Sequence, residues 1–167
     1  MPAADDDERG QLSANACRVV MKDLWLARLA RPELVKPIGD LASQVQNWTV
    51  NSDRALHRLM CYMHSTTEHV LCGHVRDPID KLSLRLYIDA DFCGERKDTK
   101  STNGGYLVLY GPNTFFPMTW VSKRQTHTSR STTESEIVSL ARSLFKEALP
   151  VLDLWERLLD RKVELAC

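Results

Sequence analysis

Two short acidic motifs carry the residues best suited to chemistry. Asp89 and Asp91 follow an apolar run and would share one face of a strand, and Glu134 and Glu136 follow the hydroxyl-rich run 131–133. Carboxylate oxygens are hard ligands that suit Mg²⁺, and a bound divalent cation can activate water for hydrolysis. The structural alternative is a solvated strand end for the first motif and a helix cap for the second. The residues alone leave both interpretations open.

Helix geometry separates the two glutamates. Ser131 and Glu134 match the capping box S/T-x-x-E, which gives Glu134 a structural role. About 200° of rotation around a regular helix separates Glu136 from Glu134, so the two cannot serve one site. We therefore expect Glu136 to be free to reach a strand end, unless Thr133 is the true cap and Glu136 is the capping-box acid.

The first of two regions is predicted to be helical. Residues 1–14 are polar, include an acidic run, and are expected to be disordered. Apolar residues then recur at helical spacing from residue 15 until Arg31-Pro32 interrupts the helix. Two further helices are expected, one over residues 33–46 and one that starts at the cap candidates Ser52-Asp53.

The second region is predicted to contain strands and then helices. Strands are expected over residues 70–72, 82–88, 106–110 and 115–122. Gly111-Pro112-Asn113 should form a turn that uses one φ > 0 residue and one residue of fixed φ. A helix should begin at Ser131 with Ile137 in its apolar stripe, and Pro150 should end or kink it before residues 152–159 continue. The fold class is therefore α+β or α/β, with a helical segment over 15–78, a boundary at Asp77-Pro78, and a three-stranded antiparallel meander with a helix over 79–167.

Four motifs occur in order along the second region. They are YIDADFCG (87–94), DTKSTNGGY (98–106), WVSKRQ (120–125) and STTESE (131–136). Together they resemble the ribonuclease H region of copia-type retrotransposon polyproteins. Upstream, residues 24–34 and 57–66 resemble the segment that joins reverse transcriptase to that nuclease. The resemblance covers nearly all of the chain after Cys17 and implies a ribonuclease H-like fold for 79–167.

The resemblance implies hydrolysis of the RNA strand of an RNA–DNA hybrid by two Mg²⁺ ions, with Mn²⁺ as an alternative. It assigns Asp89 and Glu136 as catalytic acids and metal ligands, with Asp91 and Glu134 as accessory residues. The family uses further acids, including one on a strand after the helix, and this chain stops at residues 165–167, about where that strand would begin. We therefore expect a truncated fold whose later strands are missing and which is inactive without the rest of the polyprotein or its reverse transcriptase. The alternative is a non-catalytic nucleic-acid-binding or structural remnant.

Contact with nucleic acid is expected along a local excess of basic residues between Glu95 and Arg130. Hydroxyl and amide groups in the same stretch could bind phosphates or 2′-hydroxyls. The structural alternative is a solvated loop with ordinary surface charges. The candidate contact residues are Lys97, Lys100, Ser101, Thr102, Lys123, Arg124, Gln125 and Arg130.

Composition argues against several other classes of protein. The 22 basic residues offset 22 acidic residues, so no overall field attracts nucleic acid or membrane. The five cysteines are odd in number, scattered, and preceded by no signal segment, which indicates a reducing intracellular location in the cytoplasm or nucleus. No apolar stretch reaches the roughly 20 residues that a membrane-spanning helix needs, so no membrane partner is expected.

Two further interpretations have weaker support. One is a zinc site formed by histidine and cysteine, and the other is base stacking by tryptophan. A zinc site would draw on His57, Cys61, His64, His69, Cys72 and His74, but their spacing is irregular. Base stacking would draw on Trp25, Trp48, Trp120 and Trp155, but tryptophan in an apolar pattern more often belongs to a core.

Overall fold

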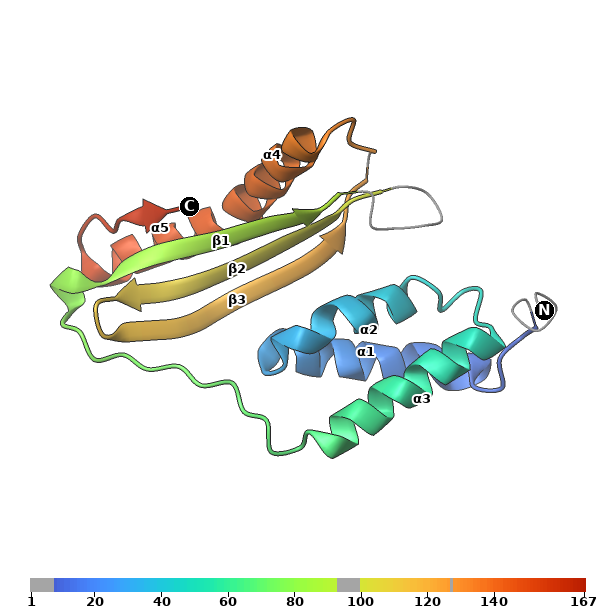
Figure 1. Ribbon diagram of the computed structural model, residues 1–167. Coiled ribbons are helices and arrows are strands. Elements are labelled where there is room, and N and C mark those ends of the chain that lie inside the picture. The colour runs from blue at the N-terminus through green and yellow to red at the C-terminus, as the bar shows by residue number, and fades with distance from the viewer. Residues whose placement is uncertain (1–7, 93–99, 127) are drawn as a thin grey trace. The chain divides into compact units, whose positions relative to one another are not determined.

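The computed structural model describes residues 8–92, 100–126 and 128–167 (Figure 1). The chain divides into two compact units between Leu71 and Cys72. The first unit is helical, and the second contains a sheet with helices. None of the helices in the described residues is both long and apolar enough to cross a membrane.

Three helices build the first unit. They are α1 (Ser13–Leu29), α2 (Val35–Ala42) and α3 (Val50–Ser65). The predicted interruption at Arg31-Pro32 is confirmed, because α1 ends at Leu29 and a 3₁₀ turn begins at Pro32. That turn and an early end at Ala42 make α2 shorter than the predicted helix over 33–46.

The start of α3 differs from the prediction. Thr49 is the N-cap, and its hydroxyl oxygen accepts a 3.4 Å bond from the backbone N–H of Ser52. Asp53 instead accepts bonds at its carboxylate from the backbone N–H groups of Gln11 and Leu12, at 2.6 and 3.3 Å. Asp53 therefore satisfies donors that precede α1, far away in the sequence, and residues 11 and 12, where we expected disorder, make specific contacts.

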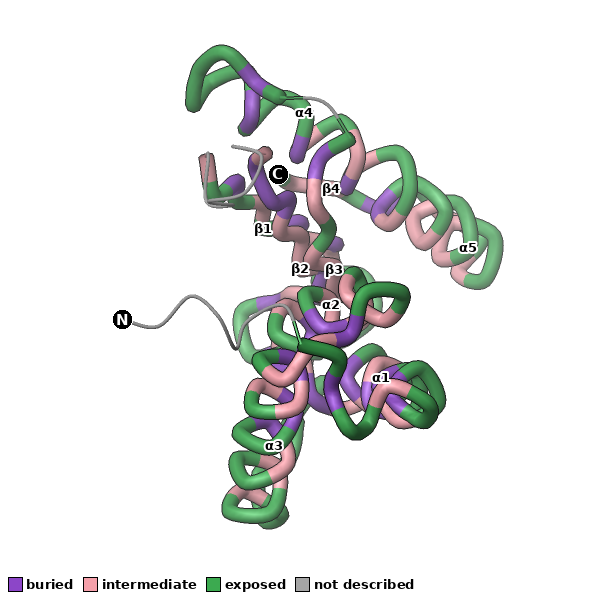
Figure 2. Tube along the Cα trace, turned by 90° about the vertical axis from the view of Figure 1, so that its right-hand side faces the viewer, coloured by how far each residue is buried: buried purple, intermediate pink, exposed green. Residues whose placement is uncertain are grey.

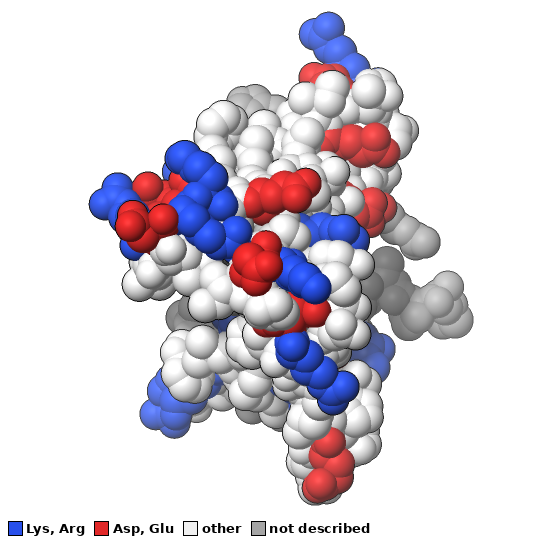
Figure 3. Space-filling model, turned by 90° about the vertical axis from the view of Figure 1, so that its left-hand side faces the viewer, with Lys and Arg blue, Asp and Glu red and all other residues white. Residues whose placement is uncertain are grey.

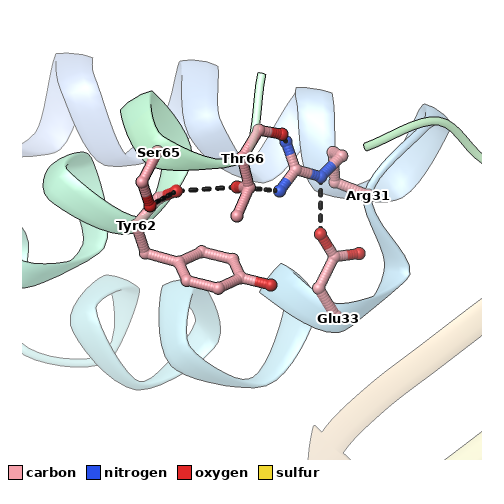
Figure 4. Close-up of polar contacts among 5 residues, drawn as sticks. All are labelled: Arg31, Glu33, Tyr62, Ser65 and Thr66. Carbon is pink, nitrogen blue, oxygen red and sulfur yellow. Dashed lines mark hydrogen bonds and ion pairs between the residues drawn. The ribbon is translucent and has the colours of Figure 1, made fainter. Parts of the chain in front are cut away.

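Arg31 ties the end of α1 to the end of α3 (Figure 4). Its guanidinium donates to Glu33 Oε1 at 2.5 Å, to Thr66 Oγ1 at 2.7 Å and to the Thr66 carbonyl oxygen at 3.3 Å. The guanidinium also lies 5.9 Å from the ring centroid of Tyr62. The hydrogen bond to the Glu33 carboxylate is the main cause of a raised pKa for Arg31. A buried guanidinium thus satisfies a carbonyl that follows α3.

Apolar residues from all three helices fill the interior of the first unit. On α1 the buried face consists of small residues and one acid, Ala16, Val20, Asp23 and Ala27, while Leu29 is exposed. Trp48 is also buried, and its indole N–H donates to Asp53 Oδ1 at 2.6 Å, which makes it a core residue. The remaining buried apolar residues of this unit are Leu34, Val35, Ile38, Leu41, Leu56 and Leu59.

The second unit is built on a four-stranded sheet of order β3-β2-β1-β4. The strands are β1 (Ser83–Asp91), β2 (Thr102–Gly111), β3 (Thr114–Arg124) and β4 (Leu165–Ala166). The first three form the predicted antiparallel meander. The prediction that all later strands are missing is wrong, because β4 pairs with β1 in parallel at Leu84 and Arg85.

Two local predictions around the meander are also wrong. Residues 70–72 form no strand, and His74 instead forms an isolated bridge with Phe115. Gly111 does not adopt positive φ, because it belongs to β2. A Cβ at Gly111 would lie 2.6 Å from Asp77 Oδ2, so close approach is the reason for glycine here. The Asp77 carboxylate in turn accepts a 2.7 Å bond from the backbone N–H of Asn113.

Two helices cover one face of the sheet (Figures 1 and 2). They are α4 (Thr132–Ser143) and α5 (Leu149–Leu159), joined by a π-helical turn at Leu144–Ala148. The π-turn accommodates Pro150 in the first turn of α5, so the helical path continues through the proline. The core between sheet and helices is formed by Leu82, Leu84, Leu86, Leu107, Leu109, Ala148 and Val163, with Trp155 packed against it.

Candidate metal-binding site

Asp89 and Asp91 lie near the end of β1, as the sequence predicts. Both are exposed, whereas Ala90 between them is buried. Strand alternation therefore directs both carboxylates to the sheet face opposite α4 and α5, because Leu84, Leu86 and Ala90 face the helices. The backbone N–H of Ala90 donates to Asp89 Oδ1 at 2.9 Å, which orients the carboxylate.

The N-terminus of α4 shows which residue caps the helix. Ser131 is the N-cap and accepts a 3.1 Å bond from the backbone N–H of Glu134. The carboxylate of Glu134 accepts a 2.7 Å bond from the backbone N–H of Arg130, one residue before the position that the capping box predicts. Thr133 is not the cap. Glu134 thus has a structural role, and Glu136 is exposed.

The face of α4 that packs on the sheet is made of serines. Ser135, Ser139 and Ser143 are fully buried, while Ile137 is 61% exposed. The prediction that Ile137 belongs to the buried stripe is therefore wrong. A Cβ at Gly105 would lie only 2.6 Å from Ser143 Oγ, so α4 lies too close to β2 for larger side chains.

Ser139 joins α4 directly to the strand that carries the first acid. Its hydroxyl donates to the backbone carbonyl oxygen of Asp89 at 2.8 Å and lies 3.3 Å from that of Gly104. Glu136 precedes Ser139 by about one helical turn and is rotated about 60° from it around the axis. Glu136 directly follows Ser135, whose carbonyl oxygen binds the Gln125 amide beside Asn103. Glu136 therefore lies at the same end of the sheet as Asp89 but on the helix-covered side, whereas the Asp89 carboxylate points to the opposite face.

The two carboxylates suit Mg²⁺ in kind but do not by themselves make a complete site. Oxygen ligands are what Mg²⁺ prefers, and both acids are accessible. No group of three or more His, Cys, Asp or Glu side chains that could hold a metal occurs within residues 8–92, 100–126 and 128–167. The same finding removes the zinc alternative for the described residues, where Cys61 is exposed and only contacts His57 at 3.5 Å.

Three of the predicted nucleic-acid contact residues are buried. The exposed fractions of Ser101, Thr102 and Gln125 are 0%, 7% and 4%. The side-chain amide nitrogen of Gln125 donates to Asn103 Oδ1 at 2.6 Å and to the Ser135 carbonyl oxygen at 3.0 Å. Side chains buried in this way cannot reach a phosphate, so these three residues serve the fold. No feature of the local sequence separates a buried glutamine from an exposed one.

The predicted basic residues do not form one surface. Lys123 and Arg124 are consecutive in β3, so they point to opposite faces of the sheet. Lys123 and Arg130 are exposed and Lys100 is partly buried, while Lys97 lies outside the described residues. Figure 3 shows basic and acidic side chains interspersed on the face that it displays. Nucleic-acid contact by Lys100, Lys123, Arg124 and Arg130 remains a prediction for individual residues.

Aromatic side chains share the sheet face of Asp89. The rings of Tyr106 and Trp120 stack with centroids 6.0 Å apart, and the Arg85 guanidinium lies 3.6 Å from the centroid of Tyr110. Burial raises the pKa of the Tyr106 hydroxyl. Trp120 thus contacts another side chain on the sheet, which agrees with a structural role for this tryptophan.

Comparison with known proteins finds transposon polyproteins among the relatives. The chain is 34% identical over 124 residues to the retrovirus-related Pol polyprotein from transposon RE2 of Arabidopsis thaliana, covering 74% of this chain and 8% of that protein. It is 28% identical over 134 residues to the polyprotein from transposon TNT 1-94 of Nicotiana tabacum, covering 80% and 10%. The secreted RxLR effector protein 161 of Plasmopara viticola is 29% identical over 118 residues, covering 71% and 78%. No protein-family model and no solved structure matches the chain.

These similarities confirm the predicted relationship to retrotransposon Pol polyproteins. The chain spans 8% and 10% of the lengths of the two polyproteins, so what the whole polyproteins do does not transfer to it directly. Assignment of the segment to the ribonuclease H region is therefore a proposal.

Proposed function

We propose that residues 72–167 form a ribonuclease H-like unit of a copia-type retrotransposon Pol polyprotein. In this proposal Asp89 and Glu136 are two of its catalytic acids, and the substrate is the RNA strand of an RNA–DNA hybrid. The partners are the rest of the polyprotein, including its reverse transcriptase. The motifs at 87–94 and 131–136 and the relationship to Pol polyproteins support this assignment.

The attachment of α4 to β1 at Asp89 is the observation that carries the proposal. The hydroxyl of Ser139 binds the carbonyl oxygen of Asp89 itself, and Glu136 lies one turn earlier on the same helix. A shared metal would require the Glu136 carboxylate to reach past the end of β1 to the sheet face on which the Asp89 carboxylate lies. The parallel strand β4, which follows the helices and pairs with β1, also fits the place where the family carries a further acid.

In this proposal Asp89 and Glu136 would hold the metal. Asp89 would offer Oδ2, since Oδ1 accepts the backbone N–H of Ala90. Glu136 would offer its carboxylate from the flank of α4, and Glu134 would keep the helix start in place through Arg130. Bound Mg²⁺ would supply the activation of water and the stabilisation of the leaving oxygen in phosphodiester displacement.

The test uses a longer polyprotein chain that contains this segment. With Mg²⁺ it should cleave labelled RNA in an RNA–DNA hybrid, and Asp89→Asn and Glu136→Gln should each reduce the rate by about 100-fold or more. Glu134→Gln is the matched control, because glutamine still accepts the Arg130 N–H, and it should retain activity. Unchanged cleavage in Asp89→Asn would rule out the assignment.

The second candidate is a non-catalytic nucleic-acid-binding or structural remnant. It is favoured by the lack of any group of three metal-binding side chains among the described residues. A remnant would bind the hybrid without Mg²⁺-dependent cleavage in the longer chain, and Asp89→Asn would leave that binding unchanged.

A further inference from the structure

We propose that Gln125 is the positioning residue that fixes the first turn of α4, and with it Glu136, against the strand ends near Asp89. Gln125 directly follows β3, and only 4% of it is exposed. Its predicted role was contact with nucleic acid, which its burial does not allow. The consequence for metal binding rests on the proposed function, whereas the consequence for α4 does not.

One amide group connects three parts of the unit. Its nitrogen donates to Asn103 Oδ1 on β2 at 2.6 Å and to the Ser135 carbonyl oxygen on α4 at 3.0 Å. Its oxygen accepts a 2.7 Å bond from the hydroxyl of Ser129, in the segment that leads into α4. The backbone N–H of Gln125 also donates to the Ser101 carbonyl oxygen at 2.8 Å. The end of β3, the start of β2 and the start of α4 are thus held by a single residue.

These bonds need an amide. An amide offers two donors and an acceptor, and Asn103, Ser129 and Ser135 use both kinds. An apolar side chain of the same length would leave buried polar atoms without partners, and a carboxylate would lose both donors. The surrounding groups therefore require an amide, and they require it at the end of a side chain as long as that of glutamine.

The contact between Gln125 and Ser135 determines the position of Glu136. Its own carboxylate is exposed, so the backbone of the helix determines where it lies. Ser135, its immediate neighbour, binds the amide of Gln125, and Ser139, one turn later, binds the Asp89 carbonyl oxygen. Two anchors about one turn apart prevent α4 from rotating about its axis, and Gln125 supplies the first.

The experiment compares Gln125→Met and Gln125→Asn with Thr114→Val in the full chain. Methionine removes the amide, and asparagine keeps it but shortens its reach, which provides a milder variant if methionine impairs folding. Thr114 is the matched control because it is 2% exposed and its hydroxyl oxygen accepts the Arg76 and Asp77 N–H groups near the β2–β3 turn, away from α4. The readouts are amide hydrogen exchange over 135–139, binding of Mn²⁺ alone, and the free energy of unfolding.

We expect both Gln125 variants to accelerate exchange over 135–139 and to weaken Mn²⁺ binding by about tenfold, as loss of an orienting partner does at metal sites. Thr114→Val should change neither the exchange over 135–139 nor the binding of Mn²⁺, even where it lowers the free energy of unfolding by a comparable amount. Wild-type exchange in both Gln125 variants, or equal weakening of Mn²⁺ binding by Thr114→Val, would overturn the inference. If Mn²⁺ binding is insensitive to Asp89→Asn and Glu136→Gln, the proposed function fails, and the exchange data alone decide the role of Gln125.

Discussion

The hydroxyl of Ser139 donates a 2.8 Å hydrogen bond to the backbone carbonyl oxygen of Asp89, fifty residues away in the sequence. The side chain is fully buried and occupies a position on α4 where an apolar residue would be expected. A buried hydroxyl is tolerated here because the strand carbonyl gives it a partner. This contact joins the middle of α4 to the end of β1.

Replacement of Ser139 by alanine should therefore lower the stability of the second unit by about 1 kcal/mol, the usual contribution of one buried hydrogen bond. Ser139→Val should cost more, because its larger side chain must fit against the strands. Native-state hydrogen exchange of the β1 and β2 amides measures this unit by itself. An opening free energy unchanged in Ser139→Ala would contradict the role given to the hydroxyl.

Gly105→Ala should destabilise the second unit by about 1–3 kcal/mol through overpacking. The added Cβ would lie 2.6 Å from Ser143 Oγ and 3.1 Å from Val121 Cγ1. Adding Ser143→Ala should recover part of the loss, because it removes the nearer atom. Gly104→Ala is the control in the same strand, since its Cβ would have no neighbour closer than 3.6 Å, and it should be close to neutral. Equal losses in the two alanine variants would show that α4 does not pack as closely as described.

Arg31→Lys should weaken the first unit by about 1–2 kcal/mol, because an ammonium cannot make the forked contacts with Glu33 and Thr66. Lys36→Met, which removes an exposed ion pair with Asp40 in the same unit, should change stability little. Hydrogen exchange of the α3 amides provides the measurement. If lysine at position 31 preserves wild-type protection, charge alone is sufficient and the fork is not needed.

Asp23 should make the first unit less stable as pH rises. It is 9% exposed, burial raises its pKa above the ordinary 3.8, and its Oδ2 has no hydrogen-bond partner in the described part of the chain. Below pH 3.8 the carboxyl is protonated in both states and carries no penalty. Between 3.8 and the raised folded-state pKa the unfolded chain ionises first, so stability falls, and above that range the full penalty remains.

Asp23→Asn should remove this pH dependence and raise the free energy of unfolding at neutral pH by about 1 kcal/mol. Unfolding by urea from acid to neutral pH, followed through the α1 amides, would measure both effects. Glu68→Gln, at an exposed carboxylate in the same unit, should leave the profile as it is. A parallel profile for wild type and Asp23→Asn would mean that Asp23 is solvated in the folded protein.

Local patterns predicted much of the fold and the role of Glu134 at the start of α4. Strand alternation placed Asp89 and Asp91 on one face, and the capping box assigned Glu134 to the start of α4. Both depend on residues within a few positions of each other. The cap of α3 was predicted less well, because Asp53 binds N–H groups some forty residues earlier, and Thr49 takes the capping position.

Periodicity and capping, which are set by near neighbours, were sufficient to predict the helical first unit, the meander, and the acidic residues at the end of β1 and the start of α4. The burial of Gln125 and the serine-lined inner face of α4 became apparent from the folded structure alone. The folded structure also showed that β4 pairs with β1. Whether a polar side chain faces water or another strand depends on groups distant in sequence, and those meet only when the chain has folded.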